Sequence, residues 1–131
     1  MATPTVLVVD DDKLTRFSLS KILGRVGYQV EEAGSAAEGM AAIEGEPPPD
    51  LVLLDIRLPD RDGFAVLQTI HATYPRLPVV MMTAHHTEDT ARRATTLGAW
   101  AYLTKPCDPA ELQSVVSAAL ASDPPPTSPI G

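Results

Sequence analysis

The sequence predicts an α/β fold of three layers, in which a parallel sheet lies between two layers of helices. Short apolar runs alternate with segments of helical period, and this strand–helix unit recurs five times along the chain. Most of the apolar runs are continuous rather than alternating, which is typical of strands that are buried on both faces. Right-handed crossovers between such strands place helices on either side of the sheet.

The expected strands are short, and four of them are clear. They are Val6–Val9, Leu51–Leu54, Val79–Met82 and Trp100–Leu103, and a weaker fifth candidate is Tyr28–Val30. The weaker candidate ends in Glu31 and Glu32. We expect it at an edge of the sheet.

Start signals or apolar spacing predict a helix after each strand. Asp12 is expected to cap the first helix, residues 35–38 match a capping box, and Asp108 precedes a proline at the first helical position. Apolar faces are formed by Leu19, Ile22, Leu23 and Val26, by Met40 and Ile43, by Val66, Leu67, Ile70 and Tyr74, and by Leu112, Val115, Val116, Ala119 and Leu120. The segment Thr87–Leu97 has only small inward residues besides Leu97, so we expect a loosely held helix there.

The composition excludes several classes of protein. The chain has 131 residues, of which 44% are hydrophobic, so one domain with a real core is expected. The net charge of −7 lacks the basic excess of a nucleic-acid-binding surface, so direct binding to DNA or RNA is not expected. No membrane span or signal sequence is visible, which favours the cytoplasm. A single cysteine cannot form an internal disulfide, and the three histidines lack the spacing of zinc ligands.

The expected domain boundaries follow these patterns. We expect residues 1–4 to be an N-terminal extension and residues 5–122 to form the domain. Residues 123–131 contain four prolines, which cannot continue a helix. We therefore expect a proline-rich linker or a disordered tail there.

Polar residues follow the expected strands at their carboxyl ends, where ligands of parallel sheets bind. They are Asp10, Asp11 and Asp12 after the first strand, Asp55 after the third, Thr83 after the fourth and Lys105 after the fifth. Neighbouring carboxylates repel one another, and a divalent cation such as Mg²⁺ removes that conflict. A lysine and a hydroxyl group beside the cation suit a phosphoryl group. The pattern therefore predicts phosphoryl transfer through an aspartyl phosphate.

Each of these residues also has an ordinary structural interpretation. A run of aspartates after a strand can form a turn and a helix cap, and Asp55 can simply end a strand. Thr83 can be a turn residue, and Lys105 can be a solvated strand end. Their joint placement favours a functional site, because structural roles give no reason for all of them to gather at strand ends.

Four motifs in order carry a resemblance to a known family. They are Val6-Leu-Val-Val-Asp-Asp11, Leu53-Leu-Asp55-Ile-Arg-Leu-Pro59 followed by Asp62-Gly63, Met82-Thr83-Ala84, and Tyr102-Leu-Thr-Lys105-Pro106. With these motifs, residues 5 to about 122 resemble the receiver domain of two-component response regulators, the CheY-like family. The resemblance implies a doubly wound, flavodoxin-like fold with strand order 2-1-3-4-5. The segment from Gly98 to Pro109 is most similar to receivers of nitrogen-regulation-type transcriptional activators.

The resemblance implies a role for each residue of the expected site. Asp55 is implied to accept a phosphoryl group from a phosphohistidine of a sensor histidine kinase or a phosphotransfer domain. Asp10, Asp11, Asp55 and the backbone carbonyl of Arg57 are implied to bind Mg²⁺ or Mn²⁺, and Lys105 is implied to contact the phosphoryl group. The chain is then a signalling switch rather than an enzyme, because it catalyses only its own phosphorylation and slow dephosphorylation.

The resemblance also implies how the switch works. Thr83 is implied to swing toward the phosphoryl group, and Tyr102 to follow inward. The Lys105–Pro106 peptide bond is implied to be cis, and Arg57 and His85 are implied to tune dephosphorylation. The expected output surface comprises the fourth helix, the fifth strand and the last helix. It is implied to control an output domain or a partner protein, and a homodimer through this surface is one alternative.

Two residues depart from the family pattern. Cys107 stands where phenylalanine is common in relatives, and we expect a small buried side chain there rather than a reactive thiol. Trp100 is either a core residue or an exposed anchor for a partner, and the sequence leaves both alternatives open.

Three other functions fit parts of the pattern. A degenerate receiver acts only as a protein-interaction module, but loss of Asp55 or Lys105 would point there and both are present. A phosphohydrolase with an aspartate nucleophile needs a second acid two residues later, where this chain has Arg57. A flavin- or nucleotide-binding domain needs a phosphate loop after the first strand, where residues 10–12 would repel phosphate.

Overall fold

The computed structural model describes residues 3–122, whose strands form one parallel sheet. The strands are β1 (Thr5–Val9), β2 (Gln29–Ala33), β3 (Leu51–Asp55), β4 (Val79–Thr83) and β5 (Ala101–Thr104). Their order in the sheet is β2-β1-β3-β4-β5, and every neighbouring pair is parallel. The predicted fold class and strand order are therefore confirmed. The predicted extension (residues 1–4) and tail (residues 123–131) lie partly or wholly outside the described residues, so these boundaries stay predictions.

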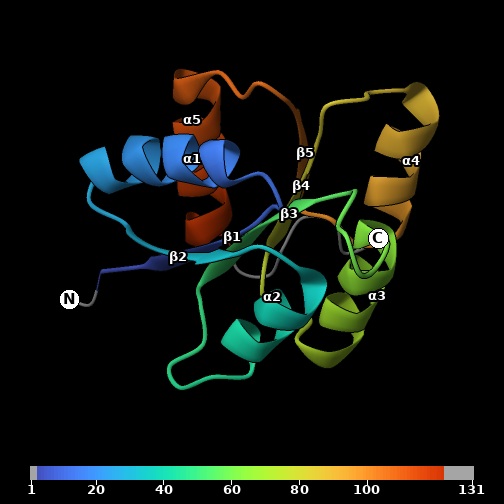
Figure 1. Cartoon of the computed structure of the whole chain (residues 1–131), viewed down its shortest axis with the longest axis horizontal. Helices are drawn as coiled ribbons and strands as arrows, with labels where there is room; N and C mark the ends of the chain where they lie inside the picture. The colour runs from blue at the N-terminus through green and yellow to red at the C-terminus, as the bar shows by residue number, and fades with distance from the viewer. Residues whose placement is uncertain (1–2, 123–131) are drawn as a thin grey trace.

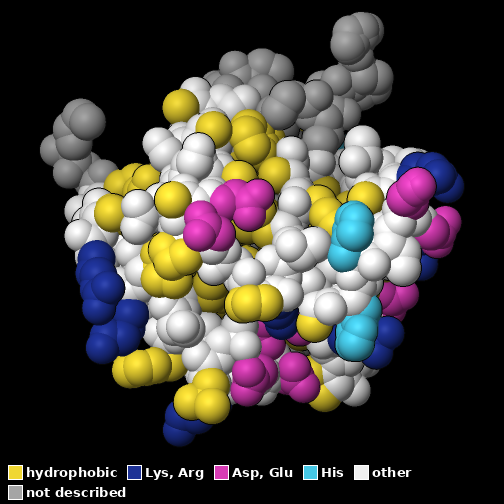
Figure 2. Space-filling view, turned by 90° about the horizontal axis from the view of Figure 1, so that it is seen from above, with side chains coloured by type: hydrophobic (Ala, Val, Ile, Leu, Met, Phe, Trp, Pro, Cys, Tyr) yellow, Lys and Arg dark blue, Asp and Glu magenta, His cyan; other side chains and the backbone are white. Residues whose placement is uncertain are grey.

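Helices cover both faces of the sheet (Figure 1). They are α1 (Lys13–Arg25), α2 (Ala36–Ile43), α3 (Gly63–Thr73), α4 (Glu88–Thr96) and α5 (Pro109–Ala121). α1 and α5 pack on one face, and α2, α3 and α4 pack on the other. Hydrophobic side chains are scattered among charged ones on the outer surface seen in Figure 2. None of these helices is long and apolar enough to cross a membrane.

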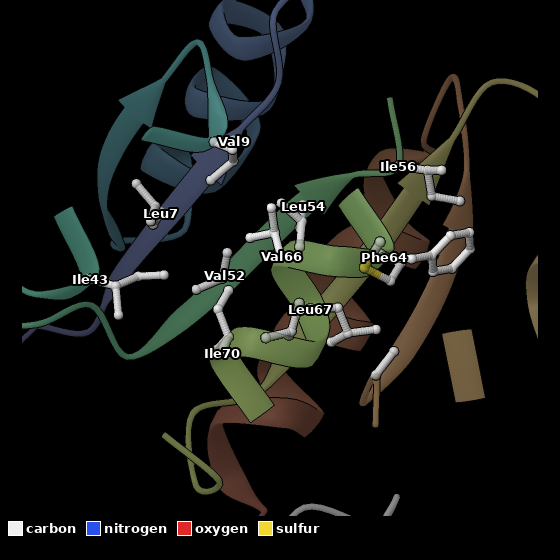
Figure 3. Packing of buried hydrophobic residues seen from close by; sticks show 14 of the residues in the cluster. Leu7, Val9, Ile43, Val52, Leu54, Ile56, Phe64, Val66, Leu67 and Ile70 are labelled. Atoms are coloured by element: carbon white, nitrogen blue, oxygen red, sulfur yellow. The ribbon is translucent and has the colours of Figure 1, made fainter. Parts of the chain in front are cut away.

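Each face of the sheet packs its own hydrophobic cluster. Successive residues of a strand point to opposite faces, so Leu7 and Val9 join the α2–α4 side, whereas Val6 and Val8 join the α1–α5 side. Figure 3 shows the packing of α3 on the sheet, with Val66, Leu67 and Ile70 beside Val52 and Leu54 of β3. Both faces of β1, β3 and β4 are buried, which explains why their sequences are continuously apolar.

Two of the predicted helix starts form as expected. Ser35 Oγ accepts a hydrogen bond from the backbone N–H of Glu38 at 3.1 Å, and Asp108 accepts one from the N–H of Glu111 at 3.0 Å. The fourth helix buries only Ala94, in agreement with the small inward residues on which its prediction as a loosely held helix is based. These features depend on short-range signals, which sequence patterns report well.

Two local predictions were wrong, and that for Asp12 was confirmed in its N-cap position but not in a side-chain hydrogen bond. The second strand runs to Ala33, because Glu31 pairs with Leu7 through the backbone while its own side chain stays in water at the sheet edge. Asp12 stands at the start of α1, but its carboxylate accepts the hydroxyl of Thr15 at 2.6 Å and caps no backbone group. Val26 follows the last turn of α1 and is 48% exposed, although its spacing places it on the apolar face.

Candidate functional site

Three aspartates meet where β1 and β3 end. Asp10 and Asp11 follow β1, Asp55 is the last residue of β3, and the two strands are neighbours in the sheet. One carboxylate oxygen from each aspartate lies within 4.8 Å of the other two. Asp10 and Asp55 are buried and Asp11 is exposed, so the cluster opens to water on one side. Within residues 3–122, this is the group of acids whose spacing suits a metal ion.

Lys105 brings the opposite charge to the cluster. Its Nζ lies 2.5 Å from Asp10 Oδ2 and 3.0 Å from Asp55 Oδ2, so one ammonium group links two acids. Its backbone N–H donates to the carbonyl of Thr83 at 2.7 Å, which ties the end of β5 to β4. The Lys105–Pro106 peptide bond is cis, as the resemblance implies.

Burial and charge shift the pKa values of the linked groups. Burial raises the pKa of Asp55, and the nearby charge of Lys105 opposes that rise only in part. Burial lowers the pKa of Lys105, but the hydrogen bond to Asp10 and the charge of Asp55 outweigh it and raise the pKa overall. Lys105 therefore pairs with two of the three acids, and the negative charge left over in the cluster suits a divalent cation with oxygen ligands.

The loop between β3 and α3 folds back over Asp55. A Cβ atom on Gly63 would lie 2.3 Å from the backbone oxygen of Asp55, so only glycine fits this close approach. Gly63 donates its N–H to the carbonyl of Ile56 at 2.7 Å, and Arg57 forms a β-bridge with Asp62. The N–H of Arg57 donates to Asp55 Oδ1 at 3.3 Å. The backbone of Arg57 is thereby held beside the carboxylate of Asp55, while its side chain is exposed.

Two residues that sequence reasoning missed support the site from outside. Asp60, in the same loop, accepts hydrogen bonds at 2.8 and 3.0 Å from two backbone N–H groups at the start of α2. Arg16 of α1 donates to the backbone carbonyl of Asp10 at 2.6 Å and forms an ion pair with Glu32 of β2 at 3.2 Å. Asp60 and its partners are 23 and 24 residues apart, so no local pattern could have found that contact.

The predicted switch residues lie to one side of the acids. Thr83 is buried at the end of β4, and its Oγ1 accepts a hydrogen bond from the backbone N–H of His85 at 3.0 Å. The hydroxyl of Tyr102 on β5 is 2.7 Å from Thr90 Oγ1 and 3.2 Å from His86 Nδ1. The hydrogen bonds described for residues 3–122 join neither Thr83 nor Tyr102 to the aspartates.

Two cavities flank the end of β3. One has a volume of about 500 Å³, contains the three aspartates and Lys105, and continues along α1 past Leu14 to Ile22. The other has a volume of about 510 Å³, and its lining includes Thr83, Arg57 and His85. Both residues predicted to tune dephosphorylation therefore line a cavity next to the predicted switch threonine.

The two departures from the family pattern lie on the α1–α5 side of the sheet. Trp100 is partly buried and packs against the hydrophobic cluster on that side, which favours its interpretation as a core residue. Cys107 is also partly buried, and burial raises the pKa of its thiol. That shift suits an unreactive packing residue.

A family comparison identifies the class of protein. The model of the response regulator receiver domain matches residues 6–117. The chain belongs to this family. Receiver domains are signalling switches, and the similarity to NtrC-type regulators that the sequence predicts is confirmed by curated relatives.

Two such relatives show how much of a longer protein this chain resembles. The DNA-binding transcriptional regulator NtrC of Bradyrhizobium sp. (strain RP501 Parasponia) is 41% identical over 122 residues, which cover 92% of this chain and 25% of NtrC. The response regulator PilR of Pseudomonas aeruginosa is 38% identical over 120 residues, which cover 92% of this chain and 27% of PilR. The chain spans about a quarter of the length of these relatives.

Solved structures share the fold. A CheY-like receiver domain from Methanospirillum hungatei superposes with a TM-score of 0.85 at 35% identity, covering 92% of this chain and 95% of that one. The receiver domain of NtrX from Brucella abortus gives a TM-score of 0.85 at 37% identity, covering 90% and 99%.

Proposed function

We propose that the chain is a phosphorylatable receiver that accepts a phosphoryl group on Asp55. The donor is a phosphohistidine of a sensor histidine kinase or of a phosphotransfer domain. The observation that carries the proposal is the meeting of Asp55 with Asp10, Asp11 and Lys105 at the carboxyl ends of the strands. Membership of the receiver family supports the same chemistry.

In the transfer, a carboxylate oxygen of Asp55 forms a bond to phosphorus. The bond between phosphorus and the donor nitrogen breaks, and its electron pair stays on the imidazole. Lys105, whose Nζ is 3.0 Å from Asp55 Oδ2, stabilises the negative charge of the phosphoryl oxygens, and Asp10 keeps the lysine in place.

The oxygen donors of the cluster fit a hard divalent cation. Mg²⁺ or Mn²⁺ would be held by Asp10, Asp11, Asp55 and the backbone carbonyl of Arg57. When bound, the cation neutralises negative charge on the carboxylates and on the phosphoryl group. The carboxylate of Asp11 supports this assignment, because it is exposed and forms no ion pair within residues 3–122. No such pair therefore has to break when a cation binds.

The response is a shift of the α4–β5–α5 surface. Thr83 turns toward the phosphoryl group, Tyr102 follows inward, and Arg57 and His85 set the rate of dephosphorylation. Support comes from α4, which buries only Ala94 and therefore moves at low cost. The shifted surface controls an output domain or a partner protein, or forms a homodimer.

The proposal is tested by intact mass spectrometry after incubation with acetyl phosphate and Mg²⁺. We expect a gain of about 80 Da, the mass of one phosphoryl group, and we expect its loss in Asp55→Asn and with EDTA. Asp89→Asn, the same substitution at an exposed position on α4, is the matched control and should still gain mass.

Other outcomes identify the alternatives. A folded wild-type protein that gains no mass and binds no beryllofluoride, a phosphoryl analogue, would be a degenerate receiver that acts as an interaction module. Continuous release of phosphate over many turnovers, without accumulation of the modified protein, would indicate an aspartate phosphohydrolase.

A further inference from the structure

The hydroxyl of Tyr102 is held by one side chain of the segment that joins β4 to α4 and by one side chain of the first turn of α4. Thr90 Oγ1 lies 2.7 Å from the hydroxyl and His86 Nδ1 lies 3.2 Å from it. The rings of His86 and Tyr102 are also neighbours, with centroids 5.4 Å apart and planes tilted by 55°. The position of Tyr102 is therefore set by polar contacts as well as by its packing on the core.

One of these two partners is itself anchored to the helix. Thr90 and Thr87 form a reciprocal capping box, in which each side-chain oxygen accepts the backbone N–H of the other residue at 3.0 Å. Thr90 thus belongs to the first turn of α4. Because Tyr102 is bonded to Thr90, its hydroxyl is tied to the start of the least buried helix of the fold.

The other partner, His86, is next in sequence to the residue that is hydrogen-bonded to the predicted switch threonine, Thr83. His85 donates its backbone N–H to Thr83 Oγ1, and His86 is the next residue. A rotation of the Thr83 hydroxyl toward Asp55 releases the N–H of His85. Because His86 is the next residue, the position of its imidazole depends on the same stretch of backbone. The contacts therefore run from Thr83 through His85 and His86 to Tyr102.

We propose that His86 is a positioning residue, which holds Tyr102 against the start of α4 and so opposes its inward movement. The proposal rests on the proposed function, because it concerns how that switch is restrained. His86 is exposed, and its ring contributes little to the hydrophobic core. Its replacement is therefore expected to change the position of Tyr102 more than the stability of the fold.

The test follows Tyr102 by ¹⁹F NMR of protein that contains 3-fluorotyrosine. The chain has three tyrosines, so Tyr28 and Tyr74 serve as internal references. In His86→Ala we expect the Tyr102 signal to move toward its position in the beryllofluoride complex. We expect the apparent affinity for beryllofluoride with Mg²⁺ to rise by about two- to tenfold, the factor that one hydrogen bond of ordinary net strength represents.

Two further variants separate positioning from general damage. His86→Asn keeps a polar group near the place of Nδ1 and should restore both the signal and the affinity of the wild type. In a Tyr102→Phe background, which lacks the hydroxyl, His86→Ala should no longer change the affinity. Thermal melts of all variants should agree closely.

The proposal is overturned if His86→Ala leaves the Tyr102 signal in place, or if the signal moves while the beryllofluoride affinity stays unchanged. It is also overturned if His86→Asn behaves like His86→Ala. Failure of the proposed function has a different signature. The wild-type protein would then bind no beryllofluoride at all, and a role of His86 in switching would fall with it.

Discussion

Asp55 is the residue at which the proposed chemistry and the stability of the fold oppose each other. Its side chain is 9% exposed, and burial raises the pKa of its carboxyl group. A nucleophilic carboxylate has to be ionised, so at neutral pH the folded protein contains a buried charge that Lys105 compensates only in part. The buried charge therefore lowers the free energy of unfolding.

We expect Asp55→Asn to raise the melting temperature at neutral pH in the absence of divalent cations. A group whose pKa is raised on folding favours the fold below its unfolded pKa, here 3.8, and loses that contribution as pH rises through the raised value. The advantage of Asn therefore shrinks as the pH falls through the raised pKa toward 3.8. Thermal melts by circular dichroism across this range, with EDTA present, measure the difference. A variant that melts below the wild type at neutral pH would contradict the expectation.

The start of α2 is joined to the β3–α3 loop rather than capped only by its own neighbours. Ser35 and Glu38 bind two local backbone N–H groups, at 3.1 and 2.8 Å. Asp60, from across the fold, binds the N–H groups of Ala36 and Ala37, which lie between those two in the sequence. The loop that carries the Arg57 carbonyl is thus held at its base by Gly63 and farther out by α2. Two hydrogen bonds therefore connect the start of α2 directly to the β3–α3 loop.

We expect Asp60→Ala to lower the melting temperature by a few degrees and to speed amide hydrogen exchange at Ala36 and Ala37. Asp60→Asn keeps one acceptor oxygen, so its melting temperature and exchange rates should fall between those of the wild type and of Asp60→Ala. Hydrogen bonds from the backbone of Ala36 and then Ala37 lower the pKa of Asp60, so its contribution is present above 3.8 and is lost as the pH falls through the lowered value. The difference between wild type and Asp60→Ala should therefore shrink in acid, toward the difference that Asp60→Asn shows. Unchanged exchange at both alanines would show that the contact is absent in solution.

Across the whole molecule, negative charge is in excess and part of it is concentrated. The net charge is −7, and three acids converge on one edge of the sheet. On the face seen in Figure 2, acidic side chains occur above the centre, on the right side and near the lower edge, while most basic ones lie toward the margins. Any cation stabilises such a protein slightly by screening, whereas a bound divalent cation stabilises it by mass action.

We expect Mg²⁺ to raise the melting temperature of the wild type well above the effect of NaCl at matched ionic strength. At a hundredfold excess over its dissociation constant, a ligand of the folded state adds about 2.7 kcal/mol to the free energy of unfolding. Asp11→Asn should lose most of this shift, because Asp11 is the exposed acid of the cluster. Glu31→Gln, at an exposed acid of the edge strand β2 that is not part of the cluster, is the control that should keep it. Equal shifts in both variants would mean that Mg²⁺ acts by screening alone.

The sequence was sufficient to predict the fold class, the strand order by resemblance, and the meeting of the acids with Lys105. These features depend on short-range patterns, namely continuous apolar runs such as Leu51–Leu54 and particular residue types directly after them. Once the strands are parallel and adjacent, their carboxyl ends share an edge, so residues such as Asp10 and Asp55 have to converge.

The contacts that tie the site to the rest of the protein were decided only by the tertiary structure. Asp60 at α2, Arg16 at the Asp10 carbonyl and His86 at Tyr102 join segments that no sequence period relates. The side of the sheet on which Trp100 packs was also undecided by its sequence position. Each of these contacts depends on the path of a loop and on a side-chain rotamer, which are selected by packing against distant residues.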